Sequence, residues 1–246
     1  MKKKWVFISI LSVAIGFFIY LIQERFLERN AWDAWNLPLT GKIIYIDPGH
    51  GGVDGGAENG EAVEKDIALS ISKMLRDYLQ QQGALVLMTR EKDIDLADED
   101  TKGLSRRKTE DLHRRVELIN ESKADYFISI HLNSIPSSRW YGAQTFYHEK
   151  YIENKIAAEM IQERLRENLD TKREAKSISH VYLMKKAKKP GVLVEVGFLS
   201  NPAEREKLLS EEYQEKVAAS IYEGIIRYFT EEREHKVKME KEKEDD

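Results

Sequence analysis

Cysteine is absent from the 246-residue sequence. The protein therefore forms no disulfide, holds no zinc through thiolates and uses no cysteine nucleophile. Any metal ion must be held by nitrogen and oxygen atoms. An excess of positive charge is also absent, because 39 basic residues face 43 acidic ones and the formal net charge is −4. The sequence thus lacks the basic footprint of a nucleic-acid-binding protein, and we expect no nucleic-acid partner.

Charges are missing from one long stretch near the N-terminus. Residues 5–22 are uncharged and mostly apolar, and they follow the lysines Lys2–Lys4. Such a run is just long enough to cross a bilayer and is long for the core of a signal peptide. We expect residues 1–23 to be a signal anchor or signal peptide that contacts the membrane, followed by a linker over residues 24–40. The lysines then stay in the cytoplasm, and the rest is exported, either membrane-anchored or secreted.

A strand–helix alternation occupies residues 41–230. Apolar runs predict strands, and apolar residues at helical spacing predict helices. The predicted strands are KIIYI (42–46), ALVLMT (84–89), YFISIH (126–131), AQTFYH (143–148), VYLM (181–184) and VLVEV (192–196), and the predicted helices lie around 66–82, 112–119, 152–165 and 213–225. This pattern indicates a single α/β domain with a mostly parallel twisted sheet flanked by helices. Residues 231–246, with eight acidic and five basic residues, are predicted to form a charged tail that is a frayed helix or disordered.

Three of the predicted strands lead to an ionisable side chain. His50 follows the first strand, His131 ends the third and Glu195 interrupts the last. Because ligands of open parallel sheets bind at the carboxyl ends of strands, we expect these side chains to face one crevice. The glycine-rich segment Gly49–Gly60 lets the backbone come close to a ligand or metal there. It is not followed by the lysine and hydroxyl pattern of a P-loop, which makes phosphate binding a weak alternative.

Glu64 lies just before the first predicted helix. Its side chain either reaches back over the strand end or stabilises the helix dipole, and the sequence alone leaves both roles open. With His50 and His131 it would supply the three nitrogen and oxygen ligands of a catalytic zinc site. Zinc in such a site acidifies water and polarises a carbonyl, which suits amide hydrolysis. Each histidine taken alone also fits a hydrogen-bonded structural role.

Glu195 lies in the apolar sequence VLVEV. Desolvation raises the pKa of a carboxyl group. A carboxylate with a raised pKa suits a base that takes a proton from water and passes it to a leaving amine. We therefore predict that Glu195 is the catalytic residue.

Five motifs occur in order along the chain: IDPGHGG at 46–52, TR at 89–90, LHRRVELIN at 112–120, SIHLNS at 129–134 and PGVLVEVGFLSN at 190–201. Together they resemble the zinc-dependent N-acetylmuramoyl-L-alanine amidases of the amidase 3 family, over about residues 42–229. The resemblance implies a Zn²⁺ enzyme that acts on peptidoglycan. Such an enzyme hydrolyses the amide between the lactyl group of N-acetylmuramic acid and the L-alanine of the stem peptide.

The family pattern also implies residue roles. By position in the motifs, His50, Glu64 and His131 match the zinc ligands and Glu195 matches the catalytic glutamate. Two further positions, Asn133 and Arg115, match residues with supporting or substrate-binding roles.

Two features differ from many members of the family. The segment 91–109 is long and charged, and from residue 94 onward it is predicted to be a surface loop or an extra helix. We expect no wall-binding module after Phe229, so that wall targeting would depend on the anchor, the cleft or an activating protein partner. Membrane-anchored members without such a module are similar to spore-cortex enzymes, whose action leads to muramic-δ-lactam. We therefore expect a role in sporulation and germination, at the forespore or cortex.

Two other functions fit the bare metal site. A zinc peptidase would cut within the stem peptide and leave the lactyl bond intact. A non-catalytic, zinc-stabilised peptidoglycan-binding domain would need no base. The apolar surroundings of Glu195 argue against the second alternative, because glutamine or leucine would be less costly to desolvate there.

Overall fold

The computed structural model describes residues 5, 15–18, 20 and 37–244. The predicted signal segment and linker, residues 1–23 and 24–40, lie mostly outside these residues and stay predictions, as do the domain boundaries. None of the helices in the described part of the chain is both long and apolar enough to span a membrane.

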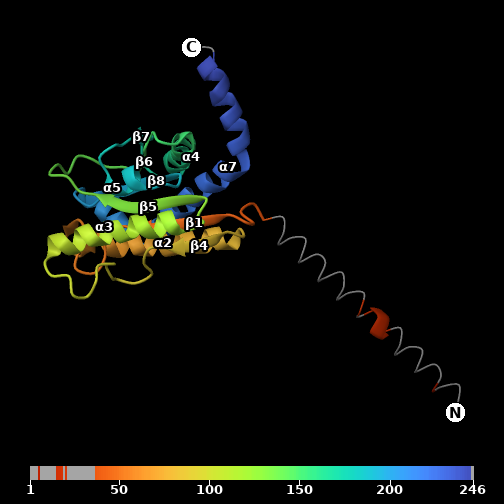
Figure 1. The fold of residues 1–246 in the computed structure, drawn as a ribbon, viewed down its shortest axis with the longest axis horizontal. Coiled ribbons are helices and arrows are strands. Elements are labelled where there is room, and N and C mark those ends of the chain that lie inside the picture. The colour runs from red at the N-terminus through yellow and green to blue at the C-terminus, as the bar shows by residue number, and fades with distance from the viewer. Residues whose placement is uncertain (1–4, 6–14, 19, 21–36, 245–246) are drawn as a thin grey trace.

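A six-stranded sheet forms the centre of the molecule (Figure 1), in the order β4-β1-β5-β8-β6-β7. Four neighbouring strands, β4, β1, β5 and β8, are parallel, whereas β6 is antiparallel to β8. The prediction of a mostly parallel sheet is therefore confirmed. The strands are β1 (Ile43–Pro48), β4 (Leu85–Met88), β5 (Tyr126–Asn133), β6 (Gln144–Tyr147), β7 (Lys176–Ser177) and β8 (Gly191–Phe198), and a separate hairpin pairs β2 (Glu58–Asn59) with β3 (Ala62–Val63).

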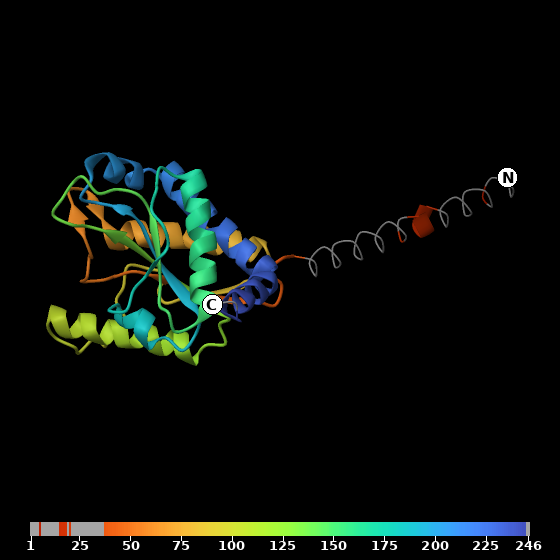
Figure 2. The same cartoon turned by 90° about the horizontal axis from the view of Figure 1, so that it is seen from above.

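Helices cover both faces of the sheet. They are α2 (Glu64–Gln81), α3 (Leu104–Glu121), α4 (Ile152–Asn168), α5 (Tyr182–Lys186), α6 (Pro202–Leu209) and α7 (Glu211–Glu244). Successive residues of a strand point to opposite faces. Ile44 and Ile46 of β1 therefore join the core formed with α2, α4 and α7, while Tyr45 joins the core formed with α3 and α5. Figure 2 shows α3 and α5 together on one side of the domain.

The predicted strand at residues 181–184 is wrong, because Tyr182–Lys186 forms the helix α5. Its adjacent residues Leu183 and Met184 are both buried, and Lys185 is exposed. That pattern belongs to a short helix rather than to an alternating strand. A run of four apolar residues is too short to distinguish the two structures.

Two helices begin at places that the sequence left uncertain. In the charged segment 91–109 a loop extends to Gly103, as one of the two alternatives predicted. The helix that begins at Leu104 is not an extra one, because α3 is the predicted helix around 112–119 extended toward the N-terminus. The unpredicted helix α6 begins with Pro202 after Asn201, whose side chain accepts a hydrogen bond from the backbone N–H of Glu204. Asn201 and Pro202 are the cap and first-turn residues that helix N-termini favour.

Candidate metal centre

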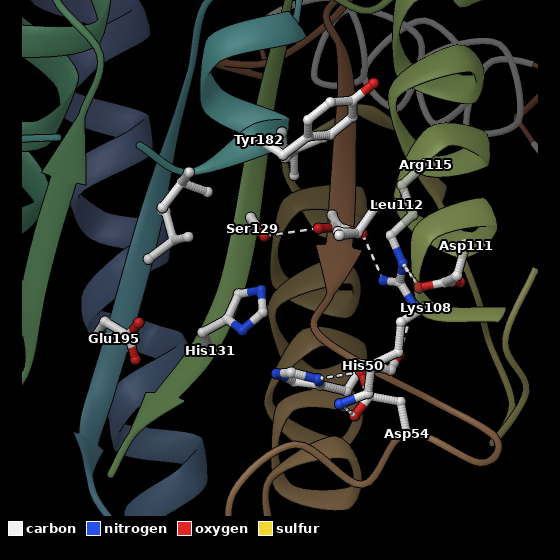
Figure 3. Close-up of a pocket in the computed structure, with 14 residues that line it drawn as sticks. His50, Asp54, Lys108, Asp111, Leu112, Arg115, Ser129, His131, Tyr182 and Glu195 are labelled. Carbon is white, nitrogen blue, oxygen red and sulfur yellow. Dashed lines mark hydrogen bonds and ion pairs between the residues drawn. The ribbon is translucent and has the colours of Figure 1, made fainter. Parts of the chain in front are cut away.

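Neighbouring strands bring the predicted site residues together. His131 on β5 is the register partner of Glu195 on β8, and His50 follows β1, the other neighbour of β5. Figure 3 shows the three side chains next to one another at the carboxyl ends of these strands. All three line one cavity of about 350 Å³. The expected crevice is therefore present.

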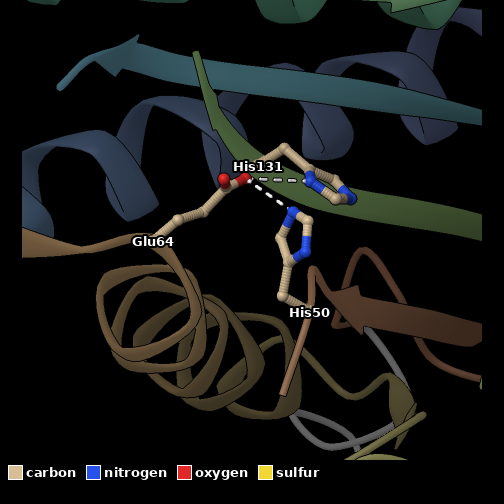
Figure 4. Close-up of side chains that lie close together, drawn as sticks. All are labelled: His50, Glu64 and His131. Carbon is tan, nitrogen blue, oxygen red and sulfur yellow. Dashed lines mark hydrogen bonds and ion pairs between the residues drawn. The ribbon is translucent and has the colours of Figure 1, made fainter. Parts of the chain in front are cut away.

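Glu64 connects the two histidines (Figure 4). It is the first residue of α2, and its Oε1 lies 3.2 Å from Nε2 of His50 and 3.0 Å from Nδ1 of His131. The three potential ligand atoms all lie within 4.8 Å of one another. Two ring nitrogens and one carboxylate oxygen facing a common point are the donor set of a catalytic zinc site. The residues present therefore fit the ion that the family resemblance implies.

The carboxylate of Glu64 is held by the backbone. Oε1 also accepts a hydrogen bond from the N–H of Leu132 at 2.9 Å, and Oε2 accepts one from the N–H of Ala57 at 2.8 Å. Burial disfavours its charge, but hydrogen bonds with His131 and His50 lower the pKa of Glu64 below its usual range. The carboxylate of Glu64 is thus ionised and held in a fixed orientation, so its role is not limited to stabilising the helix dipole of α2.

His50 adopts a left-handed backbone conformation, with φ of 58°. This conformation is uncommon outside glycine, and residues held in it cluster at functional sites. Its Nδ1 lies 2.8 Å from Oδ2 of Asp54, whose other oxygen lies 2.7 Å from Nζ of Lys108. A carboxylate on one ring nitrogen fixes the tautomer and points the other nitrogen at a metal. Burial opposes the charged form, but Asp54 and Glu64 raise the pKa of His50 to about 9.

Glycine is required where the loop passes the candidate ligands. A Cβ on Gly49 would lie 2.4 Å from Cε1 of His131. A Cβ on Gly56, which has φ of +73°, would lie 2.6 Å from Oε2 of Glu64 and 2.7 Å from Cδ2 of His50. The glycine-rich segment therefore permits the close backbone approach that the sequence predicted.

Glu195 contributes a further carboxylate to the cavity. Its Oε2 is buried and has no hydrogen-bond partner within the described part of the chain. Burial raises the pKa of Glu195 to about 7; Glu64 contributes in the same direction, while His131 and His50 oppose the rise. An unpaired carboxylate with this pKa is suited to accept and return a proton near neutral pH.

Arg115 on α3 is fully buried. Its guanidinium forms ion pairs with Asp47 at 2.8 Å and Asp111 at 2.7 Å. It also donates hydrogen bonds to the carbonyl oxygens of Pro48 at 2.6 Å and His50 at 2.5 Å. Although Arg115 borders the cavity, these contacts make it a clamp on the backbone that carries His50.

Asn133, Arg90 and Asp54 lie around the candidate ligands in different ways. Asn133 ends β5 beyond a register shift and pairs with Phe198, and it does not line the cavity. Arg90, from the TR motif, is buried and donates to the carbonyl oxygens of Pro48 and Gly49. Neither Arg90 nor Asp54 was predicted from the sequence to have a role at the site. The signals were present in the TR motif and in an aspartate four residues after His50.

Comparison with known proteins decides the family. The family model Amidase_3, described as N-acetylmuramoyl-L-alanine amidase, matches residues 44–227. The chain belongs to this family. The amidase is 58% identical to the germination-specific N-acetylmuramoyl-L-alanine amidase of Bacillus subtilis (strain 168) over 233 residues. This match covers 94% of this chain and 96% of the relative. The resemblance deduced from the five motifs is confirmed.

Solved structures show the same fold. The CwlD amidase from Clostridioides difficile, in complex with the GerS lipoprotein, has 43% identity and a TM-score of 0.75, covering 77% of this chain and 99% of that one. The catalytic domain of CwlV from Bacillus (Paenibacillus) polymyxa var. colistinus has 30% identity and a TM-score of 0.66, covering 77% and 98%. The protein is thus an N-acetylmuramoyl-L-alanine amidase, whose peptidoglycan substrate lies outside the cytoplasm.

Proposed function

We propose that the amidase uses a zinc ion held by His50, Glu64 and His131, with Glu195 as the general base. The observation that carries this proposal is the unpaired, buried Oε2 of Glu195 beside a convergent three-donor set. Zinc bound there would supply a Lewis acid that polarises the lactyl carbonyl and acidifies water.

The chain's own residues then move and orient the reacting groups. Glu195 takes a proton from the attacking water as the new C–O bond forms at the carbonyl carbon of the lactyl group. It returns that proton to the nitrogen of L-alanine as the C–N bond breaks, so the stem peptide leaves as a neutral amine. Asp54 fixes the ring of His50, and Arg115 holds the backbone on both sides of that residue.

We further propose that the enzyme acts in the spore cortex, where removal of stem peptides leads to muramic-δ-lactam. The support is the 58% identity to a germination-specific amidase over nearly the whole length of both chains. Residues 1–23 would export the domain and anchor it to the membrane, or be removed. The C. difficile CwlD amidase was solved with the GerS lipoprotein, which supports an accessory protein partner here as well.

Product analysis tests which bond is cut. The purified full chain, in detergent with zinc, is incubated with cortex peptidoglycan, and the products are examined by mass spectrometry. We expect free stem peptides that begin with L-alanine and glycan strands that keep an intact lactyl group. Release of single amino acids or shortened peptides, with the lactyl amide intact, would instead identify a zinc peptidase. Absence of any released peptide from a zinc-loaded protein would point to a missing activating partner or substrate form, whereas a protein that binds no zinc would contradict the proposed site.

A further inference from the structure

The loop between β4 and α3 lies against the segment that carries His50. Residues 91–103 of this loop, called the insertion from here on, belong to the charged segment 91–109. Asp93 accepts hydrogen bonds through Oδ1 from the backbone N–H of Gly52 at 2.8 Å and through Oδ2 from Nζ of Lys65 at 2.7 Å. Lys65 also donates to the carbonyl oxygen of Gly52 at 2.9 Å. Gly52 is thus held at both its N–H and its carbonyl, two positions after a proposed metal ligand.

The two segments also touch backbone to backbone. A Cβ on Gly51 would lie 2.2 Å from the carbonyl oxygen of Ile94, and a Cβ on Gly52 would lie 2.7 Å from the backbone nitrogen of Asp95. No side chain larger than hydrogen fits between them. The insertion therefore determines the path of the chain directly after His50.

The insertion is itself fixed to α3. Arg107 holds both oxygens of Asp95, with distances of 2.5 Å from its Nη2 to Oδ1 and 3.1 Å from its Nε to Oδ2. The N–H of Leu96 donates to Oδ1 of Asp111 at 2.9 Å, and the other oxygen of Asp111 pairs with Arg115. Arg115, which holds the backbone around His50, and the residues that hold the insertion thus all belong to α3.

We propose that residues 93–96 brace the glycine-rich loop in its metal-binding conformation, with Asp93 as a positioning residue for the site. This inference rests on the metal site proposed above. A loop rich in glycine loses more conformational entropy than other chains when it is ordered. If the brace orders Gly51 and Gly52 beforehand, less of the binding free energy is spent on ordering the ligands. The brace therefore raises the affinity for the metal without touching it.

Zinc affinity of the metal-free full chain tests this role, measured by competition with a chromogenic chelator. The variants are Asp93→Ala, Asp93→Asn and, as a control, Glu91→Ala. Glu91 belongs to the same insertion and is also acidic, but it contacts Arg76 at 3.4 Å, away from the glycine loop. Asp93 is half exposed, with 47% of its side chain accessible, so its replacement leaves the core intact, and circular dichroism checks the fold.

We expect the Kd for zinc to rise about tenfold in Asp93→Ala, the lower end of effects seen for residues behind metal ligands. Asp93→Asn should recover part of the affinity, since its amide oxygen still accepts from Gly52, and Glu91→Ala should bind as the wild type does. An unchanged Kd in Asp93→Ala, or equal losses in Asp93→Ala and Glu91→Ala, would overturn the brace.

Hydrogen exchange separates this inference from the proposed metal site. In the metal-free chain, the amides of residues 51–56 should exchange faster in Asp93→Ala than in the wild type or Glu91→Ala. If the wild type binds no zinc, the proposed function fails, and this exchange comparison alone decides whether the brace exists. Equal exchange in all three proteins would overturn it.

Discussion

Replacing Arg115 by methionine removes the guanidinium of the buried clamp and keeps an unbranched side chain. Asp47 and Asp111 would lose their cation, and the carbonyl oxygen of His50 would lose its hydrogen bond from this group. Breaking a buried ion pair from one side costs about 3–5 kcal/mol. Because Asp47 keeps hydrogen bonds from two hydroxyl groups, we expect the free energy of unfolding to fall by about 3 kcal/mol, the low end of that range.

A neighbouring arginine provides the matched control. Arg114 precedes Arg115 on α3, but its side chain is 44% exposed and pairs with surface carboxylates at 3.3–3.8 Å. Arg114→Met should therefore cost less than about 1 kcal/mol. Urea denaturation of both variants at neutral pH measures the difference. In thermal unfolding, the larger loss corresponds to a fall in Tm of about 6–12 °C.

The pH dependence gives the same clamp a second signature. Burial opposes the charge of Asp47, but Arg115, together with hydrogen bonds from hydroxyl groups, lowers the pKa of this carboxyl. A carboxyl with a lowered folded-state pKa stabilises the fold above its unfolded pKa and loses that contribution as pH falls through the folded value. Without Arg115 the buried carboxylate instead favours its protonated form. The gap in unfolding free energy between Arg115→Met and the wild type should narrow from pH 7 to pH 4. A gap below about 1 kcal/mol at pH 7, or one of equal size at both pH values, would refute this account.

Three further predictions concern the metal and the base. Asp54→Asn should weaken zinc binding by about 10–100-fold, because the ring of His50 loses its orienting carboxylate. Chelator competition measures the zinc affinity, and Asp77→Asn, at an exposed aspartate, serves as the control. Since a metal at His50 must displace a proton held with a pKa of about 9, zinc affinity of the wild type should fall as pH drops below that value. Hydrolysis should decline on acidification as Glu195, with a pKa of about 7, is protonated. A bound metal cation would favour the carboxylate, so the acid limb of the pH–rate profile should lie at or below that pKa. A pH–rate profile that stays flat down to pH 5 would contradict the role of Glu195.

The sheet and the central site residues were predictable because their signals are local. The runs IIYI and VLV are apolar at successive positions, and YFISI is interrupted only by Ser129, as expected for strands covered on both faces. Glu195 was conspicuous because it interrupts such a run, and His50 and His131 because each follows one. The segment VYLM carried too few residues to show a period, so its helix, Tyr182–Lys186, was predicted as a strand.

The residues that hold the ligands were less predictable because their partners are distant in sequence. Arg115 donates to the carbonyl oxygen of His50 across 65 positions, and Asp93 accepts from Gly52 across 41. Neither contact has a period or spacing that a single sequence displays. Asp54 is only four residues from His50, but its role depends on the left-handed turn that brings the two side chains together.

The most direct test of the account compares zinc content and hydrolysis in Glu195→Gln. The change keeps the shape of the side chain and removes the base, while the three proposed ligands remain. We predict that the variant binds one zinc ion per chain with wild-type affinity and releases stem peptides about 10²–10⁴ times more slowly than the wild type. Hydrolysis at the wild-type rate by zinc-loaded Glu195→Gln would contradict the central claim that this buried carboxylate moves the proton.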